Sequence, residues 1–358
     1  MPVKSLILNN KKISYEEIGK GIVVGNTAFE QSTLAFCRQW LNAQTAFSLK
    51  TSGSTGEPKE IVLSRAQMIL SARQTIEYFN LSPVDTVLVC LNTAYIAGIM
   101  MLVRALEAEA NIIAVEPTGN PIQYINQHID FIAVVPLQLQ QILDNTKTCH
   151  QLERCRAVIV GGAPVSVSLA ESIRGSALTI YATFGMTETL THFALKQLTP
   201  KQDENFTAFR TVTIGQDPRG CMTVASPVTE QEVLVTNDLI EILSQDTFKW
   251  LGRIDNVINS GGIKLQIEDL ERKIEHVFND LEIVNRFFIS AVSDKVLGEK
   301  VALIVESTFE IEILSSMDWS EYMAKYEKPK EILYRSQFKE TPTGKINRQQ
   351  SLNDLVTY

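Results

Sequence analysis

The sequence predicts an α/β protein: a large N-terminal domain with a doubly wound, mainly parallel sheet and a small β-subdomain, and a small α+β domain at the C-terminus. Between residues 86 and 182, short runs rich in Val and Ile alternate with segments of helical periodicity. This pattern is typical of parallel strands covered on both faces. The chain has 358 residues, and single hydrophobic cores seldom grow beyond about 250–300 residues. We therefore expect two domains.

The elements before the alternating part are short. Residues 1–45 predict one or two strands and an amphipathic helix near residues 36–41, and a brief strand is expected over residues 61–63. Ser64 and Gln67 then form a capping-box pattern, in which a hydroxyl and an amide satisfy each other's free backbone donors. A helix should begin there.

The alternating part supplies the main sheet. Ligands in such sheets bind beyond the carboxyl ends of the strands. Residues 197–246 change to short β-rich pieces with turns, which indicates the β-subdomain. We predict strands over residues 86–91, 111–115, 131–135, 157–160 and 178–182; helices over 96–106, near 121–127, 137–143 and 165–173; and a helix after residue 266 with Ile267, Leu270, Ile274, Val277 and Phe278 on one face, followed by two strands, a helix, a strand and a tail.

Composition excludes several classes of protein. There are 33 Lys and Arg against 41 Asp and Glu, a net charge of -8, which argues against a nucleic-acid-binding protein but allows a local anion site. The five cysteines, an odd number, form no C-x-x-C pair, so we expect reduced thiols and a cytoplasmic location. The scattered histidines predict no transition-metal site, and no apolar run is long enough to span a membrane.

A nine-residue glycine loop at residues 51–59, TSGSTGEPK, is the most informative stretch. Its backbone N–H groups and hydroxyls could surround phosphate oxygens, with Lys59 as the countercharge. A Walker loop does not fit, because only two residues separate Gly53 from Gly56 and Lys59 lies between Pro58 and Glu60. A flexible surface linker is the alternative.

Two further motifs follow predicted strand ends. The sequence Gly-Gly-Ala-Pro at residues 161–164 lets a flat group approach the backbone, although many strand-to-helix turns look alike. The segment 183–189, TFGMTET, combines an aromatic ring, a glycine, hydroxyls and a carboxylate. These groups can stack on a base, approach a phosphate and hold Mg²⁺. A loop with a helix cap is the alternative.

The last two motifs lie in the C-terminal third. Residues 250–271 read WLGRIDNVINSGGIKLQIEDLE, which a β-turn before a helix explains only in part. A hinge would need such residues between elements to absorb backbone rotation. Residues 341–348 read TPTGKINR and place Lys345 on a flexible stem, where most lysines are simply solvated.

Together, these motifs resemble, in order and spacing, those of the adenylate-forming enzymes, which include acyl-CoA synthetases, nonribosomal peptide adenylation domains and luciferases. The resemblance implies an ATP- and acyl-substrate-binding domain over residues 1–254 and a mobile lid domain over 255–358. It assigns Lys345, Thr187 and Glu188 to catalysis, with Glu188 on Mg²⁺, and Asp255 to the hinge. It assigns to ATP the residues Thr51, Ser52, Gly53, Ser54, Thr55, Gly56, Lys59, Gly161, Gly162, Ala163, Phe184, Gly185, Met186, Asp238 and Arg253, and to CoA the residues Ser260, Gly261, Gly262 and Lys264.

Two positions depart from the family's pattern. Phe184 stands where a tyrosine is usual, which keeps stacking on adenine but removes a hydroxyl. Asp238, expected on the ribose hydroxyls, follows Thr-Asn instead of Thr-Gly.

The resemblance implies a two-step reaction with ATP, Mg²⁺ and CoA. A carboxylate attacks the α-phosphate of ATP, and a thiol then converts the acyl-adenylate into a thioester. Placed cations and donors would lower the barrier between two anions. We expect no nucleic-acid partner.

Further residues bear on the identity of the acid. The short N-terminal part, residues 95–98 (Tyr-Ile-Ala-Gly) and the string after Glu188 look like the shortened o-succinylbenzoate-CoA ligases of menaquinone biosynthesis. That acid has a second carboxylate, for which His192 and then Lys196 are candidates, with Tyr95 and Thr191 beside the acyl group; a buried, satisfied histidine is the alternative. Other aryl- or acyl-CoA ligases, a freestanding adenylation domain and an inactive nucleotide-binding relative remain open.

Overall fold

The structure is a computed structural model that describes residues 4–50, 60–340 and 346–353. Its residues cluster into two compact units. Unit 1 comprises Met1–Gly215, Thr223–Leu234 and Ile242–Phe248, and unit 2 comprises Gln216–Met222, Val235–Glu241 and Lys249–Tyr358. The predicted domain boundary between residues 254 and 255 stays a prediction.

Unit 1 is built on a mainly parallel sheet, as predicted. Its strands run β9-β8-β7-β5-β6-β1, and each neighbouring pair in this series is parallel. Antiparallel strands follow at both ends, because β2 pairs with β1 and β10 with β9. The bounds are β1 (Ser5–Leu8), β2 (Lys11–Ser14), β5 (Thr86–Val89), β6 (Asn111–Ala114), β7 (Phe131–Val134), β8 (Ala157–Val160), β9 (Ile180–Gly185) and β10 (His192–Thr199).

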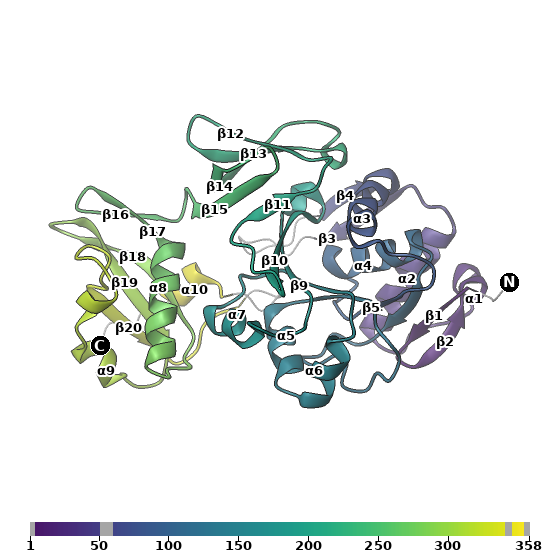
Figure 1. Ribbon diagram of the computed structural model, residues 1–358, viewed down its shortest axis with the longest axis horizontal. Helices are drawn as coiled ribbons and strands as arrows, with labels where there is room; N and C mark the ends of the chain where they lie inside the picture. Colours follow the sequence, from purple (N-terminus) through teal and green to yellow (C-terminus); the bar gives the residue numbers. More distant parts are fainter. Residues whose placement is uncertain (1–3, 51–59, 341–345, 354–358) are drawn as a thin grey trace. The chain divides into compact units, whose positions relative to one another are not determined.

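Helices cover both faces of this sheet (Figure 1). On one face, α5 (Pro136–Leu143), α6 (Thr146–Leu152) and α7 (Val167–Ile173) pack against Leu88, Ile132 and Val158. On the other face, Phe79 of α3 (Arg65–Phe79) contacts Phe131, and α3 lies against α4 (Ile96–Glu107). Residues alternate between the faces along each strand, so both faces are apolar.

Four further elements of unit 1 lie next to or before the glycine loop in the sequence. Strands β3 (Ala46–Lys50) and β4 (Glu60–Ser64) form a separate antiparallel pair that brackets residues 51–59. Helix α1 (Tyr15–Lys20) and helix α2 (Ala28–Leu41) precede them. The predicted capping box is confirmed at α3. The Ser64 hydroxyl accepts from the backbone N–H of Gln67, and the Gln67 side-chain oxygen accepts from the backbone N–H of Ser64.

The predicted β-subdomain consists of short strands and a single turn of 3₁₀ helix. Residues 197–246 contain β11 (Phe206–Ala208), β12 (Thr213–Gln216), β13 (Cys221–Ala225), η2 (Pro227–Thr229) and β14 (Leu234–Ile242); η1 (Thr187–Thr189) precedes this region and β15 (Thr247–Arg253) follows it. Strand β11 pairs with β10 and β15. The division between the two units passes through β12, β13, β14 and β15.

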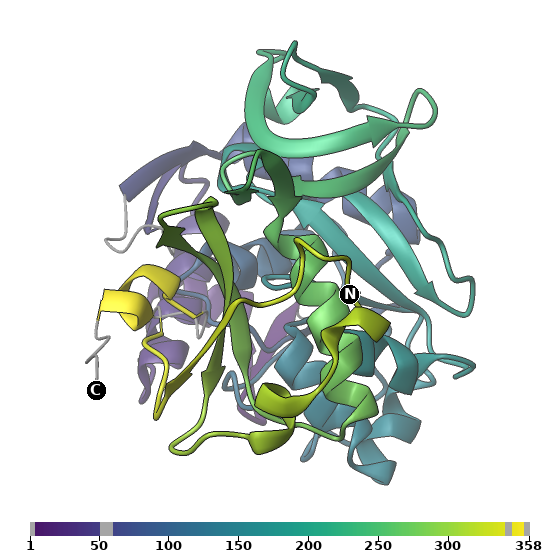
Figure 2. The ribbon, with the colours of Figure 1, turned by 90° about the vertical axis from the view of Figure 1, so that its left-hand side faces the viewer.

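Unit 2 has a five-stranded sheet with a core on each face. Helix α8 (Ile267–Asp280) packs on one face through the predicted residues Leu270, Ile274 and Val277, and α10 (Arg348–Asn353) lies toward the other, where Leu352 packs on Phe288. Figure 2 shows α8 in green and α10 in yellow on opposite sides of the strands. The other elements are β16 (Val257–Ser260), β17 (Ile263–Gln266), β18 (Phe287–Asp294), β19 (Gly298–Glu306), α9 (Glu312–Ser316), η3 (Trp319–Glu321) and β20 (Glu331–Arg335).

One predicted helix is wrong. Residues 121–127 form turns, in which Gln123 and Ile125 donate only to carbonyls three residues back. Ile122 and Ile125 are buried in the core under the sheet, so their spacing reflects burial in a turn rather than a helical face.

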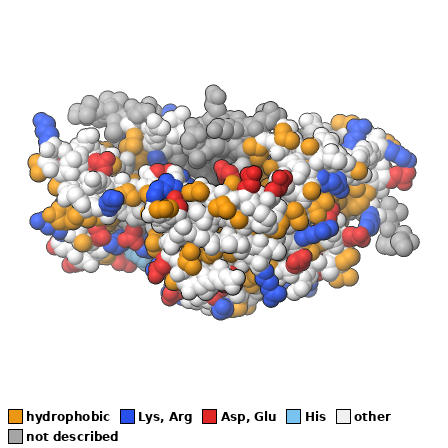
Figure 3. Space-filling model, turned by 90° about the horizontal axis from the view of Figure 1, so that it is seen from above, with side chains coloured by type: hydrophobic (Ala, Val, Ile, Leu, Met, Phe, Trp, Pro, Cys, Tyr) orange, Lys and Arg blue, Asp and Glu red, His pale blue; other side chains and the backbone are white. Residues whose placement is uncertain are grey.

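Two further observations concern membrane spans and surface charge. No helix of the described residues has both the length and the apolar character that a bilayer span needs. On the face drawn in Figure 3, described Lys and Arg side chains are interspersed with Asp and Glu.

Candidate active site

The carboxyl ends of neighbouring strands bring several predicted site residues to one edge of the unit 1 sheet. Residues 161–163 follow β8, and Phe184 and Gly185 end the adjacent β9. Tyr95 precedes α4 on the chain segment that leaves β5. Ligands of such sheets bind at this edge.

Two glycines of this edge, Gly161 and Gly185, are required by close packing. A Cβ atom on Gly161 would collide with the Thr183 hydroxyl of the neighbouring strand. A Cβ atom on Gly185 would lie 2.5 Å from the Cα atom of His192, and still closer to the carbonyl oxygen of Thr191. The neighbours of Gly185 are backbone atoms, which cannot turn aside as a side chain can.

We therefore expect Gly185→Ala to destabilise unit 1 by about 1–3 kcal/mol, since overpacking forces backbone shifts. Denaturant unfolding of the variant would measure this loss. Gly19→Ala is the matched control, because a Cβ atom at this helical position meets only the Asn42 side chain, at 3.6 Å, and alanine favours helix. Equal stability of the two variants would contradict the packing argument.

The glycine loop itself, with Thr51, Ser52, Gly53, Ser54, Thr55, Gly56 and Lys59, lies outside the described residues, and so does Lys345. The described strands β3 and β4 pair in register up to Lys50 and Glu60. The roles assigned to the loop and to Lys345 stay predictions.

Thr187 and Glu188 lie in η1, directly after β9. The Glu188 side chain is exposed and has no ion-pair partner among residues 4–50, 60–340 and 346–353. A free, exposed carboxylate is the kind of oxygen ligand that Mg²⁺ takes, together with water and phosphate oxygens. No cluster of three His, Cys, Asp or Glu side chains occurs among the described residues, so an all-protein metal cage is absent from that part of the chain.

Phe184 lies in a group of aromatic rings. Its ring centroid is 5.2 Å from that of Phe206, 5.3 Å from Phe248 and 5.7 Å from Phe193. The ring is half-buried. These edge and tilted contacts fix its orientation, while its expected contact with adenine stays a prediction.

His192 lies in a buried polar network that the sequence did not reveal. Its Nε2 atom is 3.3 Å from the Thr75 hydroxyl of α3, and its Nδ1 atom is 3.5 Å from the guanidinium of Arg104 on α4. Arg104 also donates to the Thr75 hydroxyl at 3.1 Å and to the Thr191 hydroxyl at 3.1 Å. The Ser71 hydroxyl is 2.8 Å from that of Thr191. Side chains of α3, of the loop before β10 and of the first residue of β10 therefore surround the guanidinium.

The charge in this network resides on Arg104, not on His192. Burial lowers the pKa of His192 well below its usual value, and the Arg104 charge lowers it further. Burial also lowers the pKa of Arg104, to about 9, which leaves the guanidinium protonated at pH 7. Arg104 is 2% exposed, and among the described residues no carboxylate pairs with it.

Lys196 lies elsewhere on β10. Its ammonium group is over the Phe206 ring, 5.1 Å from the centroid. The structure brings Thr191 and His192 together with Arg104, whereas Lys196 lies four residues further along β10 than His192.

The predicted ribose and hinge residues are neighbours within unit 2. Asp238 on β14 accepts a 3.0 Å hydrogen bond from the Trp250 indole, and burial raises its pKa. Arg253 at the end of β15 forms a two-pronged ion pair with Asp255, at 2.9 and 2.7 Å, which lowers the pKa of Asp255. Asp255 lies in the turn before β16, and its role as a hinge stays a prediction.

The predicted CoA-contacting residues form one hairpin. Gly261 and Gly262 make the tight turn between β16 and β17, with φ of 61° and 84°, a conformation that favours glycine. Ser260 is buried and its hydroxyl has no hydrogen-bond partner in the described structure, while Lys264 is exposed on β17.

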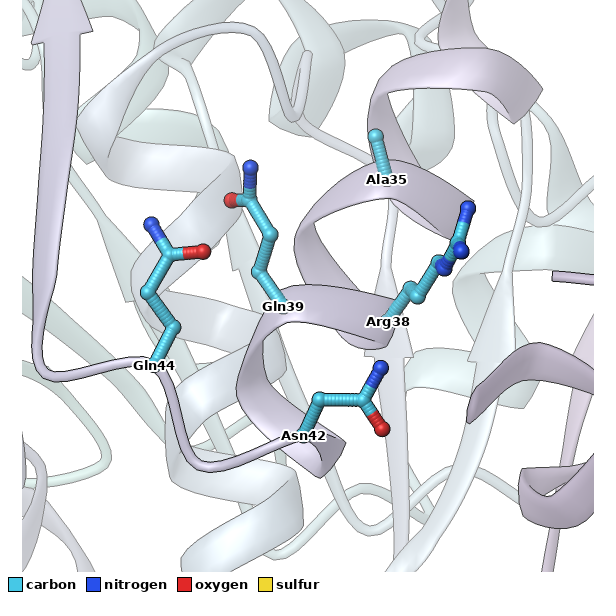
Figure 4. Close-up of a pocket in the computed structure, with 5 residues that line it drawn as sticks. All are labelled: Ala35, Arg38, Gln39, Asn42 and Gln44. Carbon is cyan, nitrogen blue, oxygen red and sulfur yellow. The ribbon is translucent and has the colours of Figure 1, made fainter. Parts of the chain in front are cut away.

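A shallow groove of about 360 Å³ lies elsewhere, along α2. Figure 4 shows its lining residues Ala35, Arg38, Gln39, Asn42 and Gln44. None of them is a predicted site residue.

Comparison with known proteins agrees with this fold. Residues 21–239 match the family described as AMP-binding enzyme. A crystal structure of an acyl-CoA synthetase (AMP-forming)/AMP-acid ligase II-like protein from Dyadobacter fermentans is 38% identical, with a TM-score of 0.64 and coverage of 94% of this chain and 97% of that one.

More distant relatives carry a specific name. The 2-succinylbenzoate–CoA ligase of Salmonella typhimurium is 24% identical over 87% of this chain and 70% of its own length. The O-succinylbenzoate coenzyme A synthetase of Bacillus subtilis, in complex with ATP and magnesium ion, has a TM-score of 0.72 at 19% identity, over 85% of this chain and 69% of that one. The chain spans 66% and 44% of two further curated 2-succinylbenzoate–CoA ligases.

The chain belongs to the family of AMP-binding enzymes. Within it, the chain is an AMP-forming ligase of the acyl-CoA synthetase class, and ATP, Mg²⁺ and CoA are the cofactor and cosubstrates of that class.

Proposed function

We propose that the protein converts o-succinylbenzoate into o-succinylbenzoyl-CoA through an acyl-adenylate. The observation that carries this proposal is the buried Arg104, whose described neighbours are neutral groups. Relatives named for this activity support the substrate, at identities near 24%.

Arg104 suits an acid with a second carboxylate. Taking a charge out of water costs several kcal/mol unless a partner of opposite sign compensates. Hydroxyls and an imidazole satisfy N–H groups of the guanidinium but leave its charge unbalanced. A substrate carboxylate arriving on the side of the half-buried Thr191 would supply the missing anion.

The location is suitable for selecting a substrate. The Thr191 carbonyl lies against Gly185, which belongs to the segment assigned to the adenylate. A carboxylate at Arg104 would thus fix one end of the acid, while the reacting carboxylate at the other end meets ATP. Fixing both ends turns an encounter into a positioned reaction.

In the first step, the reacting carboxylate attacks the α-phosphate, a C–O–P linkage forms and pyrophosphate leaves. Lys345, Thr187 and the hydroxyls of residues 51–55 would neutralise the phosphate oxygens. Glu188 would hold Mg²⁺, which supplies further positive charge when bound. Ring stacking on Phe184 and the Asp238 carboxylate would hold adenine and ribose.

In the second step, the CoA sulfur attacks the acyl carbonyl, the C–S bond forms and AMP leaves. Residues 255–358 would turn about Asp255, so that Lys345 withdraws and the turn at Gly261 and Gly262 lines the thiol channel. Ser260 and Lys264 would flank this channel. The same proposal includes a domain boundary between residues 254 and 255 and a cytoplasmic location.

A panel of acids tests the substrate directly. Pyrophosphate release is measured with o-succinylbenzoate, with its analogue that lacks the second carboxylate, with benzoate and with fatty acids. We expect o-succinylbenzoate to exceed the analogue at least tenfold in kcat/KM, because one charge-assisted contact is worth about 1.5–3 kcal/mol. A monocarboxylate as the best substrate would instead favour a general aryl- or acyl-CoA ligase, and acceptance of a phosphopantetheinyl carrier in place of CoA would favour a freestanding adenylation domain.

A further inference from the structure

The two ends of the segment that carries Lys345 are tied together in unit 2. Glu340 and Ile346 form an antiparallel bridge. The backbone N–H of Asn347 donates to the carbonyl of Lys339 at 2.7 Å. Ile346 packs with Phe338 and Phe288 in the core on the α10 face of the sheet. The described residues on either side of 341–345 are thus joined to each other, and we call residues 338–340 and 346–347 the base of this segment.

An ion pair connects this base to the other face of the sheet. Arg348, the first residue of α10, donates to Glu271 of α8 at 2.9 Å. The second carboxylate oxygen of Glu271 accepts from the backbone N–H of Ile289 at 2.9 Å. Ile289 lies on β18, which ends the strand order of this sheet. Glu271 therefore accepts a hydrogen bond from a backbone N–H group on the open side of an edge strand.

The pair is not an ordinary surface contact. The Glu271 side chain is only 20% exposed and that of Arg348 41% exposed. The Arg348 guanidinium is also 5.9 Å from the centroid of the Phe288 ring, in the core that holds Ile346. Burial raises the pKa of Glu271, and the Arg348 charge opposes that rise. The Glu271 carboxylate therefore joins α8, the edge of β18 and Arg348, which lies three positions after Lys345.

Ion pairs of Arg286 hold the chain on the Glu340 side of the base. Arg286 donates to Glu306 at 2.5 and 2.7 Å and also contacts Glu340. Glu306 in turn accepts from the backbone N–H of Phe338 at 2.7 Å. The base is thus held on the Glu340 side by Arg286 and on the Asn347 side by Glu271 and Arg348.

We propose that Glu271 and Arg348 are positioning residues for Lys345 in the adenylation step. This inference rests on the role proposed for Lys345. A lysine has a flexible four-carbon stem, so the place of its ammonium group depends on where the backbone at its base is held. A misplacement of about 1 Å in a catalytic group can cost roughly a hundredfold in rate.

The test separates the two half-reactions in the full-length protein. Adenylation is measured by ATP–pyrophosphate exchange, and thioester formation from supplied acyl-adenylate and CoA. The variants are Glu271→Gln, which keeps an acceptor for the Ile289 N–H, and Arg348→Met, with Arg348→Lys as the conservative replacement. Asp269→Asn is the matched control, because Asp269 lies on the same helix and pairs with Arg272 and Lys273 of that helix.

We expect Glu271→Gln and Arg348→Met to lower adenylation roughly tenfold to a hundredfold and to leave thioester formation within about twofold of the parent protein. Arg348→Lys should restore part of the loss, and Asp269→Asn should change neither half-reaction. In a Lys345→Ala background, Glu271→Gln should have no further effect on adenylation, because residues that act as a unit are not additive.

Parallel loss of both half-reactions together with a lower Tm would overturn the proposal and leave the ion pair a purely structural role. No change in either half-reaction would overturn it as well. If Lys345→Ala itself leaves adenylation intact, the proposed role of Lys345 is wrong. If Lys345→Ala lowers adenylation and Glu271→Gln does not, only the positioning role is wrong.

Discussion

Replacement of Lys345 by alanine should lower acyl-adenylate formation at least a hundredfold, while thioester formation from supplied acyl-adenylate largely survives. Adenylation brings a carboxylate against a triphosphate, and the loss of one well-placed donor to developing charge typically costs about 10²–10³ in rate. Thioester formation starts after pyrophosphate has left, when less negative charge needs neutralising. ATP–pyrophosphate exchange and a thioester assay with synthetic acyl-adenylate measure the two steps separately.

Lys295→Ala provides the control for this comparison. Lys295 is exposed in the turn between β18 and β19, in the same unit as Lys345. Its loss removes the same charge from unit 2 without affecting the base of residues 341–345. Equal losses in both half-reactions of Lys345→Ala would contradict the assigned role, and a comparable loss in Lys295→Ala would indicate a general charge effect.

The parts of the fold that local patterns specify were predictable. Buried parallel strands require apolar residues on both faces, so the Val and Ile runs at β5, β7 and β8 were visible in the sequence. The helix start at Ser64 depends on residues only three positions apart, and the buried face of α8 follows from helical spacing alone. Each of these signals needs no knowledge of distant segments.

The buried polar network was not predictable in this way. Arg104 follows an apolar run in a helix, and its environment is set by Thr75 and Thr191, which lie 29 and 87 positions away. A single arginine at the buried end of an apolar helix was the available signal. His192 was the predicted partner of the second carboxylate, and this role stays a prediction. Its ring lies 3.5 Å from the Arg104 guanidinium, and burial lowers its pKa well below the usual value.

The catalytic motifs show the same limit. The sequence indicated Lys345 through its motif, yet the ion pair between Glu271 and Arg348 joins residues 77 positions apart. Motif spacing identifies a reactive group, whereas the groups that hold it come from other elements of the fold. Tertiary contacts of this kind require the structure.

Arg104→Met should raise the KM for o-succinylbenzoate and lower kcat/KM by roughly a hundredfold, about 3 kcal/mol, since removal of one member of a buried charge pair typically costs 2–5 kcal/mol. Methionine nearly preserves the volume and avoids a large cavity. The analogue that lacks the second carboxylate should lose much less, because it never occupied the guanidinium. The KM for ATP should stay unchanged.

The selectivity ratio between the two acids is the decisive quantity, because a general loss of stability would lower both activities together. Arg73→Met serves as the control, since Arg73 is exposed on α3, the helix that also supplies Thr75. Arg104→Lys should fall between the parent and Arg104→Met, because an ammonium keeps the charge but cannot reach Thr75 and Thr191 with a planar fork. An unchanged selectivity ratio in Arg104→Met would show that the second carboxylate binds elsewhere. The buried guanidinium would then have a structural role, supported by its neutral neighbours alone.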